Sequence, residues 1–329
     1  MKSILIAGGA GYIGTVLTQY LLEKDYNVTV IDNFLYKNNY SIHSFLGNKK
    51  FKFLNIDIND SDNISKILDN ISNVVILAGV VGDPITKKYP EISNKINEGG
   101  VKNLIDCCNG KGLDKVIFVS TCSNYGLIKD DELADENFIL NPLSLYAKSK
   151  VLIEKYILDL RNKVDYHPTI LRFATAFGLS PRMRFDLTIS EFVKELALGK
   201  ELTVYDADTW RPYCHVKDFA RLIFRVIEES PMKVSFEVFN AGGDDNNFTK
   251  KKIVDLILKK LPRANVKYQN FGGDPRNYRV NFAKVKKVMN FEPKYSVEYG
   301  IDELIETINN QVFDDNNDLN GNYKIYYNI

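Results

Sequence analysis

The stretch Ile4–Gly14, "ILIAGGAGYIG", joins a short apolar run to Gly8, Gly11 and Gly14, which are spaced three residues apart. Residues 12–24, "YIGTVLTQYLLEK", follow with the apolar pattern of a helix. A strand that turns through glycines into a helix exposes backbone N–H groups at the positive helix end, where a pyrophosphate binds. The stretch therefore predicts a strand–turn–helix unit that holds a dinucleotide.

A second apolar run supports this interpretation. Asp32 ends "NVTVID", eighteen residues beyond Gly14, and a carboxylate at this place accepts hydrogen bonds from a ribose diol and repels a 2′-phosphate. NAD is therefore favoured over NADP. Asp57 ends "KFLNID" and is a candidate adenine contact, although a strand-terminal Asp is often only a turn residue. The other expected cofactor contacts lie in the glycine turn and at strand ends: Tyr12, Ile13, Asn33, Ile58, Leu77, Ala78 and Gly79.

The first half of the chain alternates short apolar runs with helix-length intervals, from "SILIAG" to "HPTILRFA". That rhythm predicts βαβ units and a parallel sheet that is buried on both faces. After Phe177 it breaks down into shorter, mixed elements. We therefore expect an α/β fold, with a doubly wound parallel-sheet Rossmann domain over residues 1–177 and a smaller mixed α/β substrate lobe over residues 178–329. A strand at about 235–241, "SFEVFNA", is expected to return to the first sheet.

The charge balance and the cysteines exclude several classes of partner. The 43 basic residues nearly cancel the 42 acidic ones among 329 residues, so neither nucleic acid nor an anionic membrane is an expected partner. The four cysteines lack metal-ligand spacing, and we expect no metal site. No apolar run approaches the roughly 18 residues of a membrane span or forms a signal sequence. The sequence predicts a reduced, cytoplasmic protein.

Two stretches carry side chains that can act on a substrate. "SLYAKSK" puts Tyr146 and Lys150 four residues apart on one helical face. A free phenol titrates near ~10, but an adjacent ammonium favours the phenolate, which can exchange a proton with a substrate alcohol. The pair is common on helices, and it gains weight here because it follows the glycine turn and Asp32. "STCSNYG" offers Thr121, Cys122 and Ser123 directly after the apolar run "KVIFV".

These motifs resemble the extended short-chain dehydrogenase/reductase family of nucleotide-sugar epimerases, dehydratases and dehydrogenases. The quoted glycine turn, Asp32, "STCSNYG", "YAKSK", "LRFATAFG", "RPYCHVKD" and "FNAGG" follow in that family's order over nearly the whole chain. The resemblance implies a Rossmann NAD domain, a nucleotide-sugar lobe, and a catalytic set of Thr121, Tyr146 and Lys150. It also implies that Lys150 holds the nicotinamide ribose and that Asn97 helps to place the lysine.

The strings "LAGVVGDP" and "LRFATAFGLSPRMRFDLTISEFV" look most like the C4-dehydrogenases of GDP-heptoses, which serve bacterial capsule and surface-polysaccharide synthesis. The resemblance thus implies oxidation of GDP-D-glycero-D-manno-heptose at C4 by a tightly bound NAD. Related 4,6-dehydratases carry Asp-Glu where this chain has Cys122 and Ser123, which disfavours loss of water. A 4-epimerase shares every motif and stays open, as does a non-catalytic NAD-binding regulator.

The resemblance also implies the substrate contacts. Arg211 in "TWRPYCHVKD" and Arg276 in "GGDPRNYRV" match positions that hold the diphosphate, for which planar guanidinium groups are well suited. Arg182, Arg184 and Arg279 are weaker candidates, because a charged loop residue is more often solvated, and His215 is expected to be structural. Thr175 replaces a family Asn, which puts that contact in doubt. The remaining expected substrate contacts are Thr121, Cys122, Ser123, Thr175 and Arg182.

Two partner predictions complete the interpretation. The family commonly dimerises through two helices per subunit, and residues 91–108 and 145–160 are the candidates for a homodimer. A net dehydrogenase also needs a second oxidant that recycles NADH.

Overall fold

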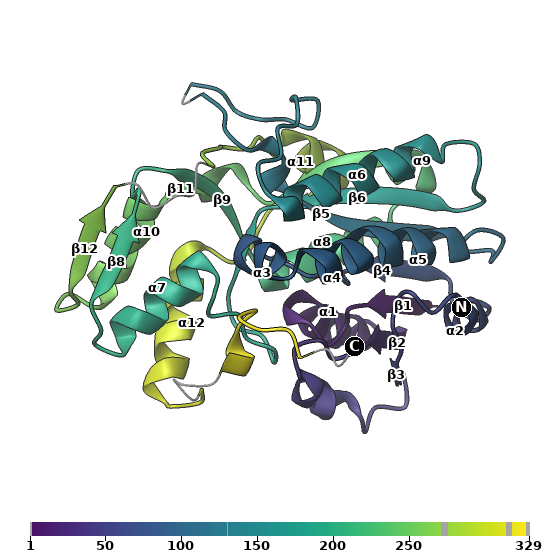
Figure 1. Ribbon diagram of the computed structural model, residues 1–329, viewed down its shortest axis with the longest axis horizontal. Helices are drawn as coiled ribbons and strands as arrows, with labels where there is room; N and C mark the ends of the chain where they lie inside the picture. The colour runs from purple at the N-terminus through teal and green to yellow at the C-terminus, as the bar shows by residue number, and fades with distance from the viewer. Residues whose placement is uncertain (1, 130, 271–275, 314–317, 327–329) are drawn as a thin grey trace.

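The computed structural model describes residues 2–129, 131–270, 276–313 and 318–326. Figure 1 shows a large α/β layer beside a smaller lobe. The large layer contains a seven-stranded parallel sheet in the order β10-β6-β5-β4-β1-β2-β3. Its strands are β1 (Ser3–Ala7), β2 (Asn27–Asp32), β3 (Phe51–Asn55), β4 (Asn73–Ile76), β5 (Lys115–Thr121), β6 (His167–Phe173) and β10 (Glu237–Ala241). The order reverses between β1 and β4, which confirms the predicted doubly wound sheet.

Helices cover both faces of this sheet because successive strand residues point to opposite sides. Ile4 and Ile6 of β1 pack in one cluster with α1 (Tyr12–Glu23) and α8 (Val216–Glu228), while Leu5 packs in the cluster on the other face. The other face is covered by α2 (Ser61–Leu68), α5 (Val101–Cys107) and α6 (Leu145–Asp159). Helix α8 follows residue 177 yet packs on α1, so more than the one expected strand returns to the first layer.

The smaller lobe has two short sheets and its own apolar core. One sheet runs β11-β9-β7 and the other β12-β8, and helices α7, α10 and α12 pack around them in a separate cluster. The strands are β7 (Thr175–Phe177), β8 (Leu202–Tyr205), β9 (Trp210–His215), β11 (Asn247–Thr249) and β12 (Val266–Gln269), and the helices are α7 (Thr188–Ala197), α10 (Lys250–Lys260) and α12 (Val297–Asn309).

Short helices fill the connections. They are η1 (Asn39–Phe45), α3 (Asp83–Lys88), α4 (Pro90–Asn94), the π-helix η2 (Lys95–Gly100), η3 (Cys122–Tyr125), α9 (Pro231–Val234), η4 (Asp244–Asn246), α11 (Ala283–Met289) and η5 (Asp318–Asn320). In the described part of the chain, no helix has both the length and the apolar character needed to cross a membrane.

Helix α6 brings the chemically reactive side chains to the sheet. It begins at the cap Ser144, whose hydroxyl accepts a hydrogen bond from the Ala147 N–H at 3.2 Å. Lys150 and Glu154 then follow one turn apart on the face toward β5 and β6, where both are buried. Glu154 forms a buried ion pair with Arg172 of β6, with 2.7 Å between Oε2 and Nη2. It also accepts a 2.5 Å hydrogen bond from Ser120, which fixes the end of β5 against α6.

The glycine turn packs too tightly for larger residues. A Cβ at Gly14 would lie 2.6 Å from the Gly8 carbonyl oxygen, and a Cβ at Gly8 would lie 2.6 Å from the Ala78 nitrogen. Gly8 also has a φ of +81°, in the region that favours glycine. The turn therefore requires glycine for steric reasons at both of these positions.

We predict that Gly14→Ala lowers the free energy of unfolding by about 1–3 kcal/mol, because the added methyl group must push α1 away from the turn. Gly47→Ala is the matched control, since among the described residues no heavy atom lies within 4 Å of a Cβ built there. It should change stability by less than about 0.5 kcal/mol. Chemical denaturation of both variants measures the difference, and equal stabilities would contradict the packing argument.

Candidate functional site

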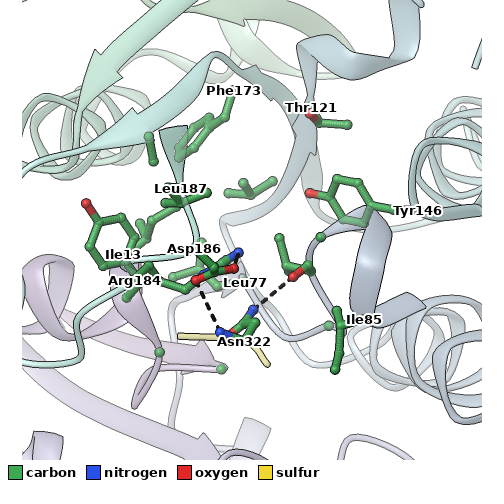
Figure 2. A pocket seen from close by; sticks show the side chains of 18 of the residues that line it. Ile13, Leu77, Ile85, Thr121, Tyr146, Phe173, Arg184, Asp186, Leu187 and Asn322 are labelled. Carbon is green, nitrogen blue, oxygen red and sulfur yellow. Dashed lines mark hydrogen bonds and ion pairs between the residues drawn. The ribbon is translucent and has the colours of Figure 1, made fainter. Parts of the chain in front are cut away.

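A cavity of about 630 Å³ opens along the carboxyl edge of the main sheet, between the glycine turn and the smaller lobe. Ligands bind at this edge in doubly wound sheets, where the strand order reverses. The cavity lining includes every predicted cofactor contact. It also includes every predicted substrate contact except Cys122 and the weaker candidate Arg279, whose guanidinium lies 5.2 Å from the centroid of the Trp210 ring. Figure 2 shows residues from both lobes that point into this space.

The glycine end of the cavity has the features of a dinucleotide site. Gly11 is the N-cap of α1 and carries no side chain that could cap the first helical turn, so the turn's N–H groups can bind a pyrophosphate. Asp32 at the end of β2 accepts hydrogen bonds from the N–H groups of Ala10 (3.1 Å) and Phe34 (2.9 Å). Burial raises the pKa of Asp32 to about 6, against the lowering effect of those N–H groups and of Arg182. The carboxylate is therefore mostly ionised at neutral pH.

Neighbouring loops complete this end of the cavity. Asp57 accepts hydrogen bonds from the Asn33 side chain (2.9 Å) and from the Asn59 N–H (2.8 Å), so it joins the loops after β2 and β3. The Tyr12 hydroxyl donates to the carbonyl oxygen of Gly178 at 2.6 Å and ties α1 to the smaller lobe. Asp57 is thus a turn residue that also lines the cavity.

Tyr146 and Thr121 lie on the wall that the start of α6 and the end of β5 supply (Figure 2). Burial raises the pKa of Tyr146, while the Arg184 guanidinium and the Thr121 side chain lower it. Lys150 donates to the Val119 carbonyl oxygen at 2.7 Å, and its Nζ lies 5.8 Å from the centroid of the Tyr146 ring. Burial lowers the pKa of Lys150 to about 8, opposed by Glu154. Lys150 therefore keeps most of its charge at neutral pH.

Arg184 has a larger place in the site than its sequence suggests. Its Nε and Nη2 atoms form a paired contact with the Asp186 carboxylate at 2.8 and 2.5 Å. The pair lies across the cavity from Tyr146 (Figure 2). A charged loop residue is more often solvated, and this is why the sequence ranks it low. Arg184 and Asp186 lie two residues apart at a turn, and this close spacing of opposite charges is the signal that could have identified the pair.

Cys122 lies outside the cavity lining, which corrects its expected substrate contact. It is 1% exposed, its Sγ donates to the Arg172 carbonyl oxygen at 3.2 Å, and burial raises its pKa. The chain turns into η3 directly after Thr121, so Cys122 enters the core on the far side. Ser123 does line the cavity, and its hydroxyl lies 3.1 Å from that of Tyr278.

The side chain of Asn97 is hydrogen-bonded to the loop after β4, and among the described residues it has no hydrogen bond to Lys150. Its Oδ1 accepts from the Val80 N–H (2.7 Å), and its Nδ2 donates to the Val80 carbonyl oxygen (3.0 Å). Asn97 therefore shapes the loop after β4 rather than the position of Lys150.

The predicted arginines occupy different parts of the cavity. The Cζ atom of Arg211 lies 5.0 Å from the centroid of the Tyr278 ring. Arg276 forms an ion pair with Asp83, with 2.7 Å between Nη1 and Oδ2. Arg182 instead lies 5.1 Å from the centroid of the Tyr36 ring, in the loop after β2. The structure therefore places Arg182 at the cofactor end of the cavity, near Tyr36 and Asp32, whereas the sequence predicted a substrate contact for it.

Thr175 and His215 occupy different environments, one at the cavity and one in the core. Thr175 begins β7 and lines the cavity. His215 is fully buried and caps α8, with its Nε2 2.7 Å from Glu303, so its role is structural. Within residues 2–129, 131–270, 276–313 and 318–326, no group of three or more His, Cys, Asp or Glu side chains could hold a metal ion.

Known proteins share this arrangement. The sequence profile described as "NAD dependent epimerase/dehydratase family" matches residues 4–242. A UDP-glucuronate 4-epimerase from Thermodesulfobacterium geofontis is 25% identical over 315 residues, which cover 93% of this chain and 95% of that protein. A UDP-N-acetyl-α-D-glucosaminuronate decarboxylase from Bacillus cytotoxicus is 28% identical over 322 residues, with 93% and 97% covered.

Solved structures agree with the sequence relatives. A UDP-glucuronic acid 4-epimerase from Bacillus cereus, in complex with UDP-glucuronic acid and NAD, superposes with a TM-score of 0.83 at 26% identity. A UDP-glucose 4-epimerase from Thermotoga maritima, with UDP-glucose, gives 0.82 at 25%. Each match covers 94% of this chain and 100% of the other. Because the family profile spans most of the chain and the cavity has the features of a dinucleotide site, this protein belongs to the NAD dependent epimerase/dehydratase family of extended short-chain dehydrogenase/reductase enzymes.

Proposed function

We propose that this enzyme oxidises a nucleotide diphosphate sugar at C4 with NAD and forms a 4-keto sugar. The observation that carries the proposal is that Tyr146 and Thr121 face one cavity with the glycine turn and Asp32. An alcohol oxygen held between the two hydroxyl groups would lie beside the cofactor site. The relatives that are named for UDP-sugars support a nucleotide sugar as the substrate.

The residues of the chain account for the proton in this reaction. The Thr121 hydroxyl orients the C4 hydroxyl group, and the Tyr146 phenolate takes its proton as the C–H bond breaks. NAD, when bound, accepts the hydride that leaves C4. Lys150 and Arg184 favour the phenolate by their positive charge, and the walls of the cavity hold the sugar in place.

We further propose that the substrate is GDP-D-glycero-D-manno-heptose. The protein would then be a GDP-heptose C4-dehydrogenase of capsule synthesis. Both strings that resemble those enzymes contribute to the cavity lining. The first string contributes Leu77, Ala78, Gly79, Val81, Gly82, Asp83 and Pro84, and the second contributes Phe173, Ala174, Thr175, Ala176, Arg182, Arg184, Asp186, Leu187, Thr188 and Glu191. They also meet there, because a Cβ at Gly82 would lie 3.6 Å from Arg184 Nη2. Arg211 and Arg276 are our candidates for the diphosphate.

Elimination of water finds little support at this site. It needs an acid and a base beyond the hydride machinery, and the two residues after Thr121 are a buried Cys122 and Ser123. A thiol whose pKa is raised by burial and a serine hydroxyl are both poor replacements for a carboxylate base.

A 4-epimerase is the second candidate, and the named epimerases among the relatives favour it. The two reactions share the oxidation at C4 and differ in whether the hydride returns to the same sugar. Net oxidation requires a second oxidant for NADH. A purely regulatory NAD-binding protein loses support, because the chain belongs to an enzyme family and keeps Thr121, Tyr146 and Lys150. The homodimer through residues 91–108 and 145–160 also stays a proposal, which a sizing measurement tests.

We expect Tyr146→Phe to lose about 10²–10⁴-fold in kcat, because the sugar hydroxyl then has no base. NADH binding should stay within about twofold of wild type, since the phenol oxygen is the only group removed. Stopped-flow absorbance at 340 nm and NADH fluorescence measure the two effects. Retention of turnover in this variant would exclude Tyr146 as the base.

The product distinguishes the two candidate reactions. With GDP-D-glycero-D-manno-heptose and excess NAD, we expect a 4-keto sugar, detected by mass spectrometry as a loss of two hydrogens or as its hydrate. Parallel reactions contain UDP-glucose and UDP-glucuronic acid. Recovery of only the C4 epimer, with no ketone, would replace the dehydrogenase with the epimerase.

We assign the adenosine ribose of NAD to Asp32 and expect its affinity to depend on pH. The Asp32 pKa of about 6 means that the carboxylate is charged above pH 6 and protonated below it. NADH affinity should therefore fall as the pH drops from 7 to 5. Asp32→Asn should weaken binding roughly 10-fold or more at pH 7, by loss of a charged hydrogen-bond acceptor, and should flatten this pH dependence. A wild-type affinity that is constant from pH 7 to 5 would refute the assignment.

A further inference from the structure

The C-terminal residues 318–326, which we call the clasp, leave the smaller lobe and run to the NAD-binding layer. Figure 1 shows this yellow segment passing between the two parts toward α1 and β2. Hydrogen bonds join its backbone to the NAD-binding layer and to the smaller lobe. The contacts are Tyr40 Oη to the Leu319 carbonyl (3.2 Å), Phe185 N–H to the Asn320 carbonyl (2.8 Å), Arg182 Nη2 to the Gly321 carbonyl (3.0 Å), and Tyr326 N–H to the Leu35 carbonyl (2.9 Å).

Two residues of the clasp, Asn322 and Tyr323, line the cavity, and Asn322 is the one that lies beside the Arg184–Asp186 pair. Its backbone N–H donates to Asp186 Oδ1 at 3.1 Å, and its Nδ2 donates to the Val81 carbonyl oxygen at 2.8 Å. Figure 2 shows both bonds and the position of Asn322 beside the Arg184–Asp186 pair. The side chain is only 9% exposed. One residue therefore joins the loop after β4 to the smaller lobe.

The clasp spans the crevice in which a dinucleotide binds. Leu35 lies in the loop after β2, and Val81 lies in the loop after β4. Strand β1 and its glycine turn lie between these strands in the sheet. A segment that is bonded to both loops thus crosses the mouth of the site at the turn. Arg182, bonded to the clasp, also lies close enough to Asp32 to lower its pKa.

We propose that the clasp retains NAD in the enzyme and that Asn322 is the positioning residue that keeps it closed. Only Ile325 of the clasp belongs to a buried apolar cluster, so hydrogen bonds supply most of the contacts named above. The Val81–Asn322 bond is the contact between the clasp and the loop after β4. Its loss should free one side of the crevice without disturbing the sheet or the core.

A retained cofactor has a consequence for the reaction, and this step rests on the proposed function. NADH formed at the site would stay beside the 4-keto sugar. The hydride can then return to the carbon of the 4-keto group, which restores NAD and an alcohol at C4, as in an epimerase.

The test measures the release of NADH by the full-length protein, with no sugar present. The protein is loaded with NADH and mixed with excess NAD, and the loss of NADH fluorescence gives the dissociation rate constant. Asn322→Asp keeps the side-chain shape, removes the donor to Val81 and adds a charge beside Asp186. We expect it to release NADH at least 10-fold faster than wild type, and Asn322→Ala several-fold faster, with association rates unchanged.

Asn70→Asp is the matched control, because it makes the same chemical change at an exposed site outside the cavity lining. It should release NADH at the wild-type rate. If Asn322→Asp fails to fold, Asn322→Ala decides the question. Three results would each overturn the clasp. The Asn322 variants could release NADH at the wild-type rate, their association rate could change by the same factor as their release rate, or the wild-type protein could bind no NADH. Failure to oxidise any nucleotide sugar would overturn only the proposed function, since this test contains no sugar.

Discussion

The close packing of the glycine turn against α1 and the start of the β4 loop is the constraint on which the rest of the site depends. A Cβ at Gly8 would collide with the backbone of Ala78, and a Cβ at Gly14 would collide with the Gly8 carbonyl oxygen. This contact sets the N-terminus of α1 at the point where the strand order reverses. The carboxyl ends of β2, β4 and β5 then surround that point, and each supplies one wall of the cavity.

A buried polar network fixes the reactive wall in the same way. Glu154 accepts from Ser120 and pairs with Arg172, so it links α6 to β5 and β6. Removing one partner of such a pair leaves a buried charge without compensation. The network therefore holds Thr121 at the end of β5 in a constant relation to Lys150 and to Tyr146 at the start of α6.

The charge opposite Tyr146 comes from a different part of the chain. Arg184 is held by Asp186, and Asp186 is in turn bonded to Asn322 of the clasp. Burial works against the phenolate form of Tyr146, and Arg184 offsets part of this effect. The electrostatics of Tyr146, the proposed base, thus depend on the smaller lobe and the C-terminal segment, while Tyr146 itself belongs to the NAD-binding layer.

The sequence alone predicted the parallel sheet and the glycine turn, which the structure confirms. It also proposed Asp32 and the set of Thr121, Tyr146 and Lys150, which line one cavity. These features depend on local patterns, namely apolar periodicity, glycine spacing and the four-residue spacing on one helix. The direction of individual side chains was less accessible, as Cys122 turns into the core and Asn97 bonds to Val80. Only the tertiary structure decided the place of α8, the position of Arg182 beside Tyr36, the Arg184–Asp186 pair and the clasp. Each of these depends on contacts between segments that lie far apart in the chain or on the direction in which a loop leaves the sheet, and sequence spacing records neither of them.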